Sequence, residues 1–167
     1  MGALSLHSLH HSIFRWLFKG QLLKNFDVLA QEFVPQYLSD SLFHPVYKKL
    51  IEAKNNGDYT VILSSSPDFL VAQFAKFFEV DEWSASLYET NQNLYFDSIS
   101  SIMTGVCKAE YMTALSQRLK IPLSQTIAYS DSYLDLPFLK NAGKAVAVRP
   151  DRKLRAMCQD FFWEIID

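Results

Sequence analysis

Serine, lysine and aspartate side chains stand at points of the sequence where an apolar run ends or a helix is expected to begin. Ser64 follows one apolar run, and Asp131 closely follows another, with Asp135 four positions later. Lys108 lies between them, where we expect a helix to start. Hydroxyl and backbone N–H groups at a helix N-terminus bind anions, and lysine adds a compact positive charge for phosphate. Carboxylates suit Mg²⁺, so the set indicates Mg²⁺-assisted phosphoryl transfer.

Taken singly, each of these residues has a structural explanation. A serine after a strand commonly caps the next helix, and a lysine in a first turn is commonly solvated. Asp131 and Asp135 could simply complement a helix dipole. The order and spacing of the residues carry the prediction, rather than any one of them.

The elements that position these residues alternate in type after Tyr59. Strands are expected at residues 60–63, 83–88, 94–96, 126–129 and 145–148, and helices after Ser66, at 108–119 and 134–141, and from Asp151. In the first of these helices, Ser66 is the expected N-cap, and Leu70, Phe74 and Phe77 are the expected buried face. This alternation predicts an α/β fold with a parallel sheet covered by helices. Ligands of such sheets bind at the carboxyl ends of the strands.

Residues 1–57 have a different, helical pattern. Apolar side chains recur at helical spacing, at Leu6, Leu9, Ile13, Trp16 and Leu17, and then at Phe26, Leu29, Ala30, Phe33 and Val34. We expect Pro35 to end the second helix, and a third helix to run from Pro45 to Asn55. The predicted organisation is a helical region at 1–57 and an α/β core at 58–167.

Four segments carry a resemblance to a known family. Residues 61–70, 108–115 and 128–139 are similar to the second, third and fourth motifs of haloacid-dehalogenase-type (HAD) phosphatases, in the phosphoserine-phosphatase-like subfamily IB. Residues 145–151 resemble the strand ending of that branch. The resemblance implies a Rossmann-like core with a helical cap, of which residues 1–57 would be a part. It also implies Mg²⁺-dependent hydrolysis of a small phosphorylated metabolite.

The resemblance also implies a role for each matched residue. Ser64 and Ser65 would bind the phosphate group of the substrate. Lys108 would neutralise that phosphate and hold the nucleophile in register. Asp131 would bind Mg²⁺ directly, while Asp135 would lie beside the metal and orient a bound water or Lys108.

The first motif of the family, Asp-x-Asp at the end of the first strand, is not found. The chain contains eleven aspartates, and no two of them are separated by a single residue. The resemblance assigns the nucleophile, which forms an aspartyl-phosphate, and the general acid/base to this motif. It also places its strand in the middle of the sheet. We therefore expect the carboxyl-terminal part of a longer phosphatase, inactive or very weak by itself.

The missing first motif leaves two further interpretations open. The neighbours of its strand would have unpaired backbone edges, which favour self-association of the chain through exposed sheet edges. The alternative to a truncated enzyme is a catalytically inactive HAD-like domain that binds a phosphorylated ligand or a protein partner.

Composition and charge exclude several other classes. The formal net charge of −2 gives no basic excess for nucleic acid, and no segment approaches the ~20 apolar residues of a membrane span. Cys107 and Cys158 form no metal-ligand spacing and no disulfide framework, so we predict a cytoplasmic protein.

His7, His10 and His11 have a spacing that could bind a metal, but we expect them on the solvent-exposed face of a helix. The apolar helices around them could lie on a membrane, although packing within a cap is the favoured interpretation.

Overall fold

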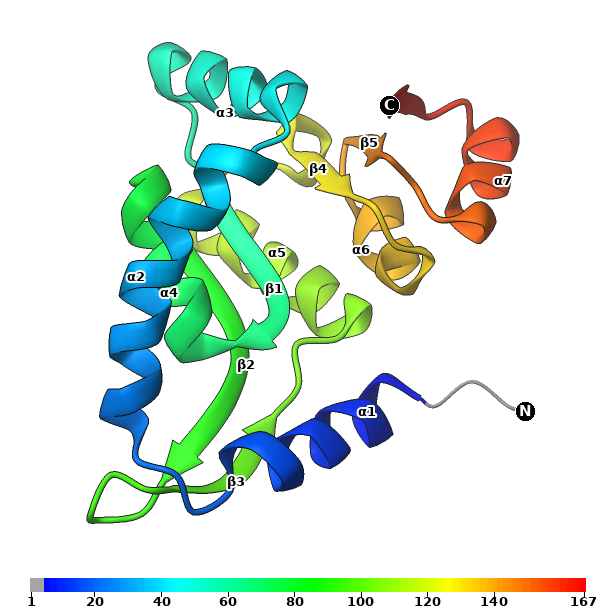
Figure 1. Cartoon of the computed structure of the whole chain (residues 1–167). Helices are drawn as coiled ribbons and strands as arrows, with labels where there is room; N and C mark the ends of the chain where they lie inside the picture. The colour runs from blue at the N-terminus through cyan, green and yellow to red at the C-terminus, as the bar shows by residue number, and fades with distance from the viewer. Residues whose placement is uncertain (1–4) are drawn as a thin grey trace. The chain divides into compact units, whose positions relative to one another are not determined.

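The computed structural model describes residues 5–167, apart from the side chain of Ser39. The chain forms two compact units, residues 1–103 and 104–167, each with its own three-stranded sheet. Figure 1 shows the order of the elements along the chain. Both units combine helices with parallel strands, so the predicted α/β class is confirmed.

The sheet of the first unit has the strand order β1-β2-β3. β1 (Val61–Pro67) and β2 (Glu82–Thr90) are parallel, with α4 (Asp68–Phe78) as the crossover between them. β2 and β3 (Phe96–Ser101) form an antiparallel hairpin. The side chain of Asn91 closes its turn by accepting hydrogen bonds from the N–H groups of Asn93 and Tyr95. The strands predicted at 60–63 and 83–88 are thus confirmed, with shifted ends. The strand predicted at 94–96 instead begins at Phe96 and continues to Ser101, and the sheet is mixed rather than wholly parallel.

The start of α4 differs from the sequence prediction. Pro67, not Ser66, is the N-cap residue, because β1 continues through the serine run before the helix begins. The helix buries Val71 and Ala75, whereas Phe77 is 46% exposed. Small side chains face inward because α4 packs closely on β2. Helical periodicity alone does not predict this contact.

Four helical segments precede β1. They are α1 (Leu6–Ile13), a π-helical turn η1 (Phe14–Phe18), α2 (Leu23–Ser41) and α3 (His44–Asn56). The expectation that Pro35 ends the second helix is wrong, since α2 continues for six more residues. Ala30, Val34 and Leu38, spaced four residues apart, are buried on both sides of the proline. Their burial offsets the backbone hydrogen bond that proline removes.

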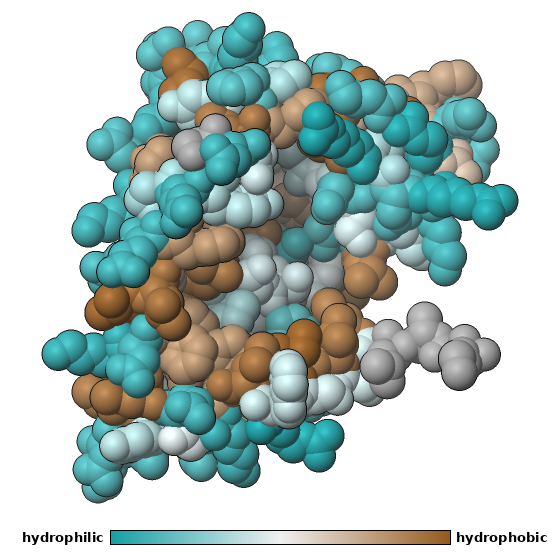
Figure 2. All heavy atoms as spheres, in the orientation of Figure 1, coloured by the Kyte–Doolittle hydropathy of each residue, from teal (hydrophilic) through white to brown (hydrophobic). Residues whose placement is uncertain are grey.

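The buried face of the first helix also differs from the prediction. His10 and Phe14 are buried, whereas Leu9, Ile13 and Trp16 are exposed. The two buried positions are one turn apart and lie beside the expected leucine and isoleucine positions. The π-helical turn that follows, where Lys19 N–H bonds to Phe14 C=O five residues back, is wider and changes the phase of the residues after Phe14. Figure 2 shows the resulting apolar surface along α1 and α2.

An aromatic cluster forms the core of the first unit. Phe14, Tyr88 and Phe96 are buried at its centre, and Phe18, Leu23, Phe26, Phe69 and Ile99 pack around them. Most ring pairs meet edge to face, for example Phe14 and Tyr88, whose centroids lie 5.3 Å apart.

The sheet of the second unit is wholly parallel, in the order β4-β5-β6. Its strands are β4 (Ile127–Ser130), β5 (Lys144–Val148) and β6 (Glu164–Ile166); the last was not predicted from the sequence. Its helices are α5 (Gly105–Leu119), α6 (Leu136–Asn141) and α7 (Arg152–Phe161), with 3₁₀ turns at Leu123–Gln125 (η2) and Tyr133–Asp135 (η3).

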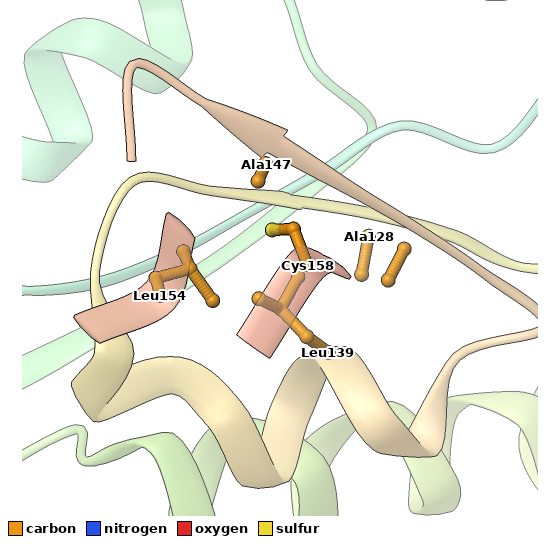
Figure 3. Packing of buried hydrophobic residues seen from close by; sticks show 6 residues of the cluster. Ala128, Leu139, Ala147, Leu154 and Cys158 are labelled. Atoms are coloured by element: carbon orange, nitrogen blue, oxygen red, sulfur yellow. The ribbon is translucent and has the colours of Figure 1, made fainter. Parts of the chain in front are cut away.

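Small residues on the strands allow the helices of this unit to approach closely. The core cluster contains Ala128, Ala145 and Ala147 from the strands and Leu139, Leu154 and Cys158 from α6 and α7. Figure 3 shows Leu139, Leu154 and Cys158 converging on the strands. Among residues 5–167, no helix is long and apolar enough to cross a membrane.

Candidate active site

A buried ion pair joins α5 to the turn after β4. Lys108 Nζ donates to Asp135 Oδ2 over 2.7 Å, and the side chains of the two residues are only 9% and 12% exposed. Ser130, the last residue of β4, donates its hydroxyl to the same Asp135 oxygen, also over 2.7 Å. One carboxylate therefore orients both a lysine and a serine at the carboxyl end of a parallel strand.

A glycine allows this pair to form. The Cβ of any other residue at Gly105 would lie 2.1 Å from the carbonyl oxygen of Leu134 and 3.0 Å from the Cα of Asp135. The first turn of α5 therefore packs directly on the backbone of η3. Thr104 caps the helix by accepting the N–H of Cys107. Lys108 consequently lies one turn into α5, rather than at its first residue as predicted, and faces Asp135.

Asp131 follows Ser130 in a tight turn. The Ser132 N–H donates to Ser130 Oγ, and the Asp131 carbonyl accepts the N–H of Asp151. These bonds fix the backbone of the turn, while the Asp131 side chain is exposed. The acid predicted to bind a metal thus stands at the end of the same strand as Ser130.

Asp151, shortly after β5, contacts the turn that follows β4 and was not among the site residues predicted from the sequence. Its Oδ1 caps α7 by accepting the N–H groups of Lys153 and Leu154, and its Oδ2 accepts the N–H of Tyr133. Burial raises the pKa of this carboxyl, but the hydrogen bonds together lower it below the ordinary value. Asp151 therefore ties α7 to the turn that carries Asp131. The available signal was an acid directly after Pro150, where a helix begins.

The donors at this strand end fit a magnesium ion. Mg²⁺ commonly takes one or two carboxylates and keeps several waters, so a single accessible acid such as Asp131 is compatible with it. Lys108 and Ser130 both donate to Oδ2 of Asp135, which assigns this carboxylate to holding the two side chains. Within residues 5–167, no group of three or more His, Cys, Asp or Glu side chains forms a ready-made metal cluster.

Ser64 and Ser65 lie in the first unit, at the end of β1. Ser64 Oγ accepts the N–H of Ser66, so its own hydroxyl proton can donate to another acceptor. The Ser65 carbonyl accepts the hydroxyl of the buried Ser86, which fixes the backbone here to β2. The two serines thus lie in the second half of β1, whereas Asp131 directly follows β4.

One of the three N-terminal histidines differs from the expectation, since His7 is exposed and His11 partly exposed. His10 is buried, and its Nδ1 lies 3.0 Å from the hydroxyl of Tyr88, so it is not on a wet face. Burial lowers the pKa of His10, and the nearby His11 and His7 lower it further. Close by, burial raises the pKa of the Asp68 carboxyl, which accepts the N–H of Tyr88. The hydrogen bond between His10 and Tyr88 ties α1 to β2.

Residues 4–140 match the model of the haloacid dehalogenase-like hydrolases. The chain belongs to this family. The chain is 25% identical over 150 residues to a phosphoserine phosphatase of Mycobacterium tuberculosis. This match covers 89% of this chain and 49% of that protein. The chain is also 26% identical over 144 residues to a histidinol-phosphatase of Neisseria meningitidis, covering 82% and 64% of the two chains. The resemblance to phosphoserine-phosphatase-like HAD hydrolases is thereby confirmed.

A solved structure shows the same fold. A protein of unknown function from Bordetella pertussis superposes with a TM-score of 0.77 at 21% identity, over 88% of this chain and 68% of that one. The chain spans about half the length of the mycobacterial HAD relatives that it matches.

Proposed function

We propose that this chain carries part of the site of a Mg²⁺-dependent phosphomonoester hydrolase. The observation that carries the proposal is the buried Lys108–Asp135 pair, joined by Ser130 at the end of β4. A lysine held at a strand end by a carboxylate presents a fixed positive charge, as a transferring phosphoryl group requires. The family match supports a hydrolase, and phosphatases among the relatives support phosphomonoesters.

In the proposed site, each residue has one task. Ser64 donates its hydroxyl to a phosphate oxygen, with Ser65 beside it at the end of β1. Lys108 neutralises the phosphate, and Asp135 keeps the lysine in position. Asp131 holds Mg²⁺, which supplies positive charge to the phosphate oxygens when bound.

The nucleophile is proposed to come from a segment outside this sequence, because the eleven aspartates include no Asp-x-Asp. This chain alone is then inactive or very weak. The substrate class is small phosphorylated metabolites, since two of the relatives are named for phosphoserine and histidinol phosphate hydrolysis. The sequence has only two cysteines, Cys107 and Cys158, and this low cysteine content supports a cytoplasmic location.

Phosphate binding tests the proposal without requiring turnover. Calorimetric titration with inorganic phosphate in the presence of Mg²⁺ should show binding to the unaltered chain. Lys108→Met should weaken this binding at least about tenfold, the scale of one charge-assisted contact of about 1.4 kcal/mol. Lys120→Met, at the exposed far end of α5, is the matched control and should bind as the unaltered chain does. Equal binding by both variants would contradict the proposed role of Lys108.

The alternative is a non-catalytic HAD-like domain that binds a phosphorylated ligand or a protein partner. The absence of Asp-x-Asp from the sequence favours it. Hydrolysis of p-nitrophenyl phosphate separates the two functions. Mg²⁺-dependent turnover by the purified 167-residue chain, lost in Lys108→Met, would exclude the non-catalytic alternative.

A further inference from the structure

Two of the three N-terminal histidines have their rings side by side on the surface of α1. His7 and His11 are four positions apart, so the helix places them on the same face. Their ring centroids lie 4.4 Å apart, and the planes of the two rings are inclined by 45°. Because His7 is exposed and His11 is partly exposed, ions in the solvent can reach the pair.

The third histidine is held on another side of the helix. His10 is buried, and its Nδ1 lies 3.0 Å from the hydroxyl of Tyr88. This contact fixes the rotation of α1 about its own axis, and it leaves His7 and His11 outside the core. His10 therefore takes no part in a surface site, and any such site is built from two histidines rather than three.

The ring nitrogens of His7 and His11 are not used by the part of the chain that the structure describes. Within residues 5–167, no hydrogen bond involves a side-chain nitrogen of either residue. A neutral imidazole has one nitrogen with a free lone pair, so the two rings offer two nitrogen donors to one ligand. Imidazole nitrogen suits zinc, nickel and copper ions, whereas Mg²⁺ takes oxygen ligands.

We propose that His7 and His11 form a binding site for one divalent transition cation of the zinc, nickel and copper class, and that the bound cation stabilises α1 in its helical form. Two ligands are ring nitrogens, and water completes the coordination. Residues four positions apart are about 13 Å apart in an extended chain, so the pair exists only while residues 7–11 are helical. The proposal does not depend on the proposed phosphatase function.

Local charges oppose a cation at this place, which makes both histidines necessary. Arg15 Nε donates to the carbonyl of His11 over 3.4 Å. His7 lies in the first turn of α1, where the helix dipole is positive. No acidic residue stands before Asp27 in the sequence, so no acid of α1 itself offsets these charges. The affinity must come from the two bonds to nitrogen, and loss of either histidine should remove most of it.

A zinc titration followed by NMR locates the site. Zn²⁺ is diamagnetic, so the ring signals of its ligands shift and stay visible. Zn²⁺ should shift the signals of His7 and His11 together, while that of His44, outside α1, should stay in place. Excess Mg²⁺ should not reverse the shifts, because Mg²⁺ prefers oxygen ligands. Reversal by Mg²⁺, or unchanged signals of His7 and His11, would overturn the proposal.

Calorimetry on matched variants tests whether both rings are required. His7→Gln and His11→Gln should each weaken Zn²⁺ binding at least about tenfold, since even the loss of a residue that only supports a ligand costs that much in metal sites. His44→Gln should bind Zn²⁺ as the unaltered chain does. Cys107→Ser, which removes a partly buried thiol, should also leave binding unchanged. Full binding by either of the first two variants would contradict a shared site.

Moving one histidine tests the geometry rather than the composition. The double variant His11→Gln with Ser12→His keeps the number of histidines but places the second ring about 140° around the helix from His7. Ser12 is exposed, so the exchange disturbs no core contact. Zn²⁺ binding should be as weak as in His11→Gln alone. Binding restored to that of the unaltered chain would show that the two rings do not share one cation.

Hydrogen exchange tests the effect on the helix. At a free Zn²⁺ concentration of about ten times Kd, the protection factors of α1 amides should rise about tenfold, because the cation binds only the helical form. EDTA should reverse the rise, and His7→Gln should show none. Zn²⁺ binding without a rise in protection would contradict stabilisation of α1. Absence of Zn²⁺ binding to the unaltered chain would overturn the site itself.

Discussion

At the scale of single residues, the chain holds a buried charge pair whose partners come from elements far apart in the sequence. Lys108 and Asp135 are both nearly inaccessible, and Ser130 shares the acceptor oxygen. Burying two charges is tolerated when each satisfies the other and additional hydrogen bonds are made. Such a pair contributes little net stability, but it fixes where the lysine points, which the proposed phosphate binding requires.

A double-mutant cycle should show this coupling. Lys108→Met and Asp135→Leu should each lower the free energy of unfolding by about 3 kcal/mol, because each leaves a buried charge without its partner. The double variant should lose at least about 2 kcal/mol less than the sum, as measured by urea denaturation. The control is Lys144→Met in the pair with Glu164, where the side chains are 57% and 43% exposed and the expected loss is below about 1 kcal/mol. Additive losses in the Lys108 cycle would contradict the coupling.

His10 should make the attachment of α1 dependent on pH. Burial lowers the pKa of His10, with His11 and His7 adding to the shift, so the folded state binds a proton less readily than the unfolded state. The stability that this group contributes is present above the ordinary pKa of 6.5 and is lost as the pH falls through the lowered value. The protection factors of α1 amides, which correct observed exchange for its intrinsic dependence on pH, should therefore fall between pH 7.5 and 5.

Replacement of the histidine provides the control for that pH dependence. His10→Gln should flatten it, since glutamine does not titrate. His44→Gln, at the start of α3, should leave it in place. An identical pH profile in His10→Gln would show that another group is responsible.

At the scale of elements, close backbone approaches determine how helices present the site residues. The α5 helix lies directly on η3 only because residue 105 lacks a Cβ. In the core of the second unit, the small side chains of Ala128, Ala145 and Ala147 likewise allow the helices to approach the strands closely.

Gly105→Ala should separate α5 from η3. The added Cβ would meet the Leu134 carbonyl oxygen at 2.1 Å, so the backbone must move and the Lys108–Asp135 pair should break. We expect a loss of about 3 kcal/mol in unfolding free energy and a loss of phosphate binding in calorimetry. Gly57→Ala is the control. A Cβ there meets no atom within 4 Å, and only the left-handed backbone opposes it, at about 1 kcal/mol. Retained phosphate binding in Gly105→Ala would contradict this account.

Packing of α7 should depend on one leucine. Leu154 is fully buried in the core cluster, so Leu154→Ala should cost about 2–5 kcal/mol in urea denaturation. Phe162, directly after the same helix, is 94% exposed, and Phe162→Ala should change stability by less than about 0.5 kcal/mol. Similar losses in the two variants would show that the cluster does not support α7.

At the scale of the whole molecule, each unit begins its sheet with an edge strand that ends in proposed site residues. β1 ends in the serine run, and β4 ends at Ser130 followed by Asp131. Both strands are paired on one side only within residues 5–167.

The sequence by itself determined the class of the fold and the order of the site residues. Strands, turns and caps such as the Asn91 turn and Asp151 depend on residues only a few positions away, so periodicity and capping patterns predict them. The polar residues at the ends of β1 and β4 follow from the same reasoning, because strand ends are local features.

Only the tertiary structure decided which faces are buried and which groups meet. The burial of His10, the continuation of α2 through Pro35, and the contact of Gly105 with Leu134 depend on neighbours distant in the sequence. The same is true of Lys108 and Asp135, 27 residues apart, and of His10 and Tyr88, 78 residues apart. Local patterns set which conformations each segment favours, whereas the burial of apolar area between segments selects among them.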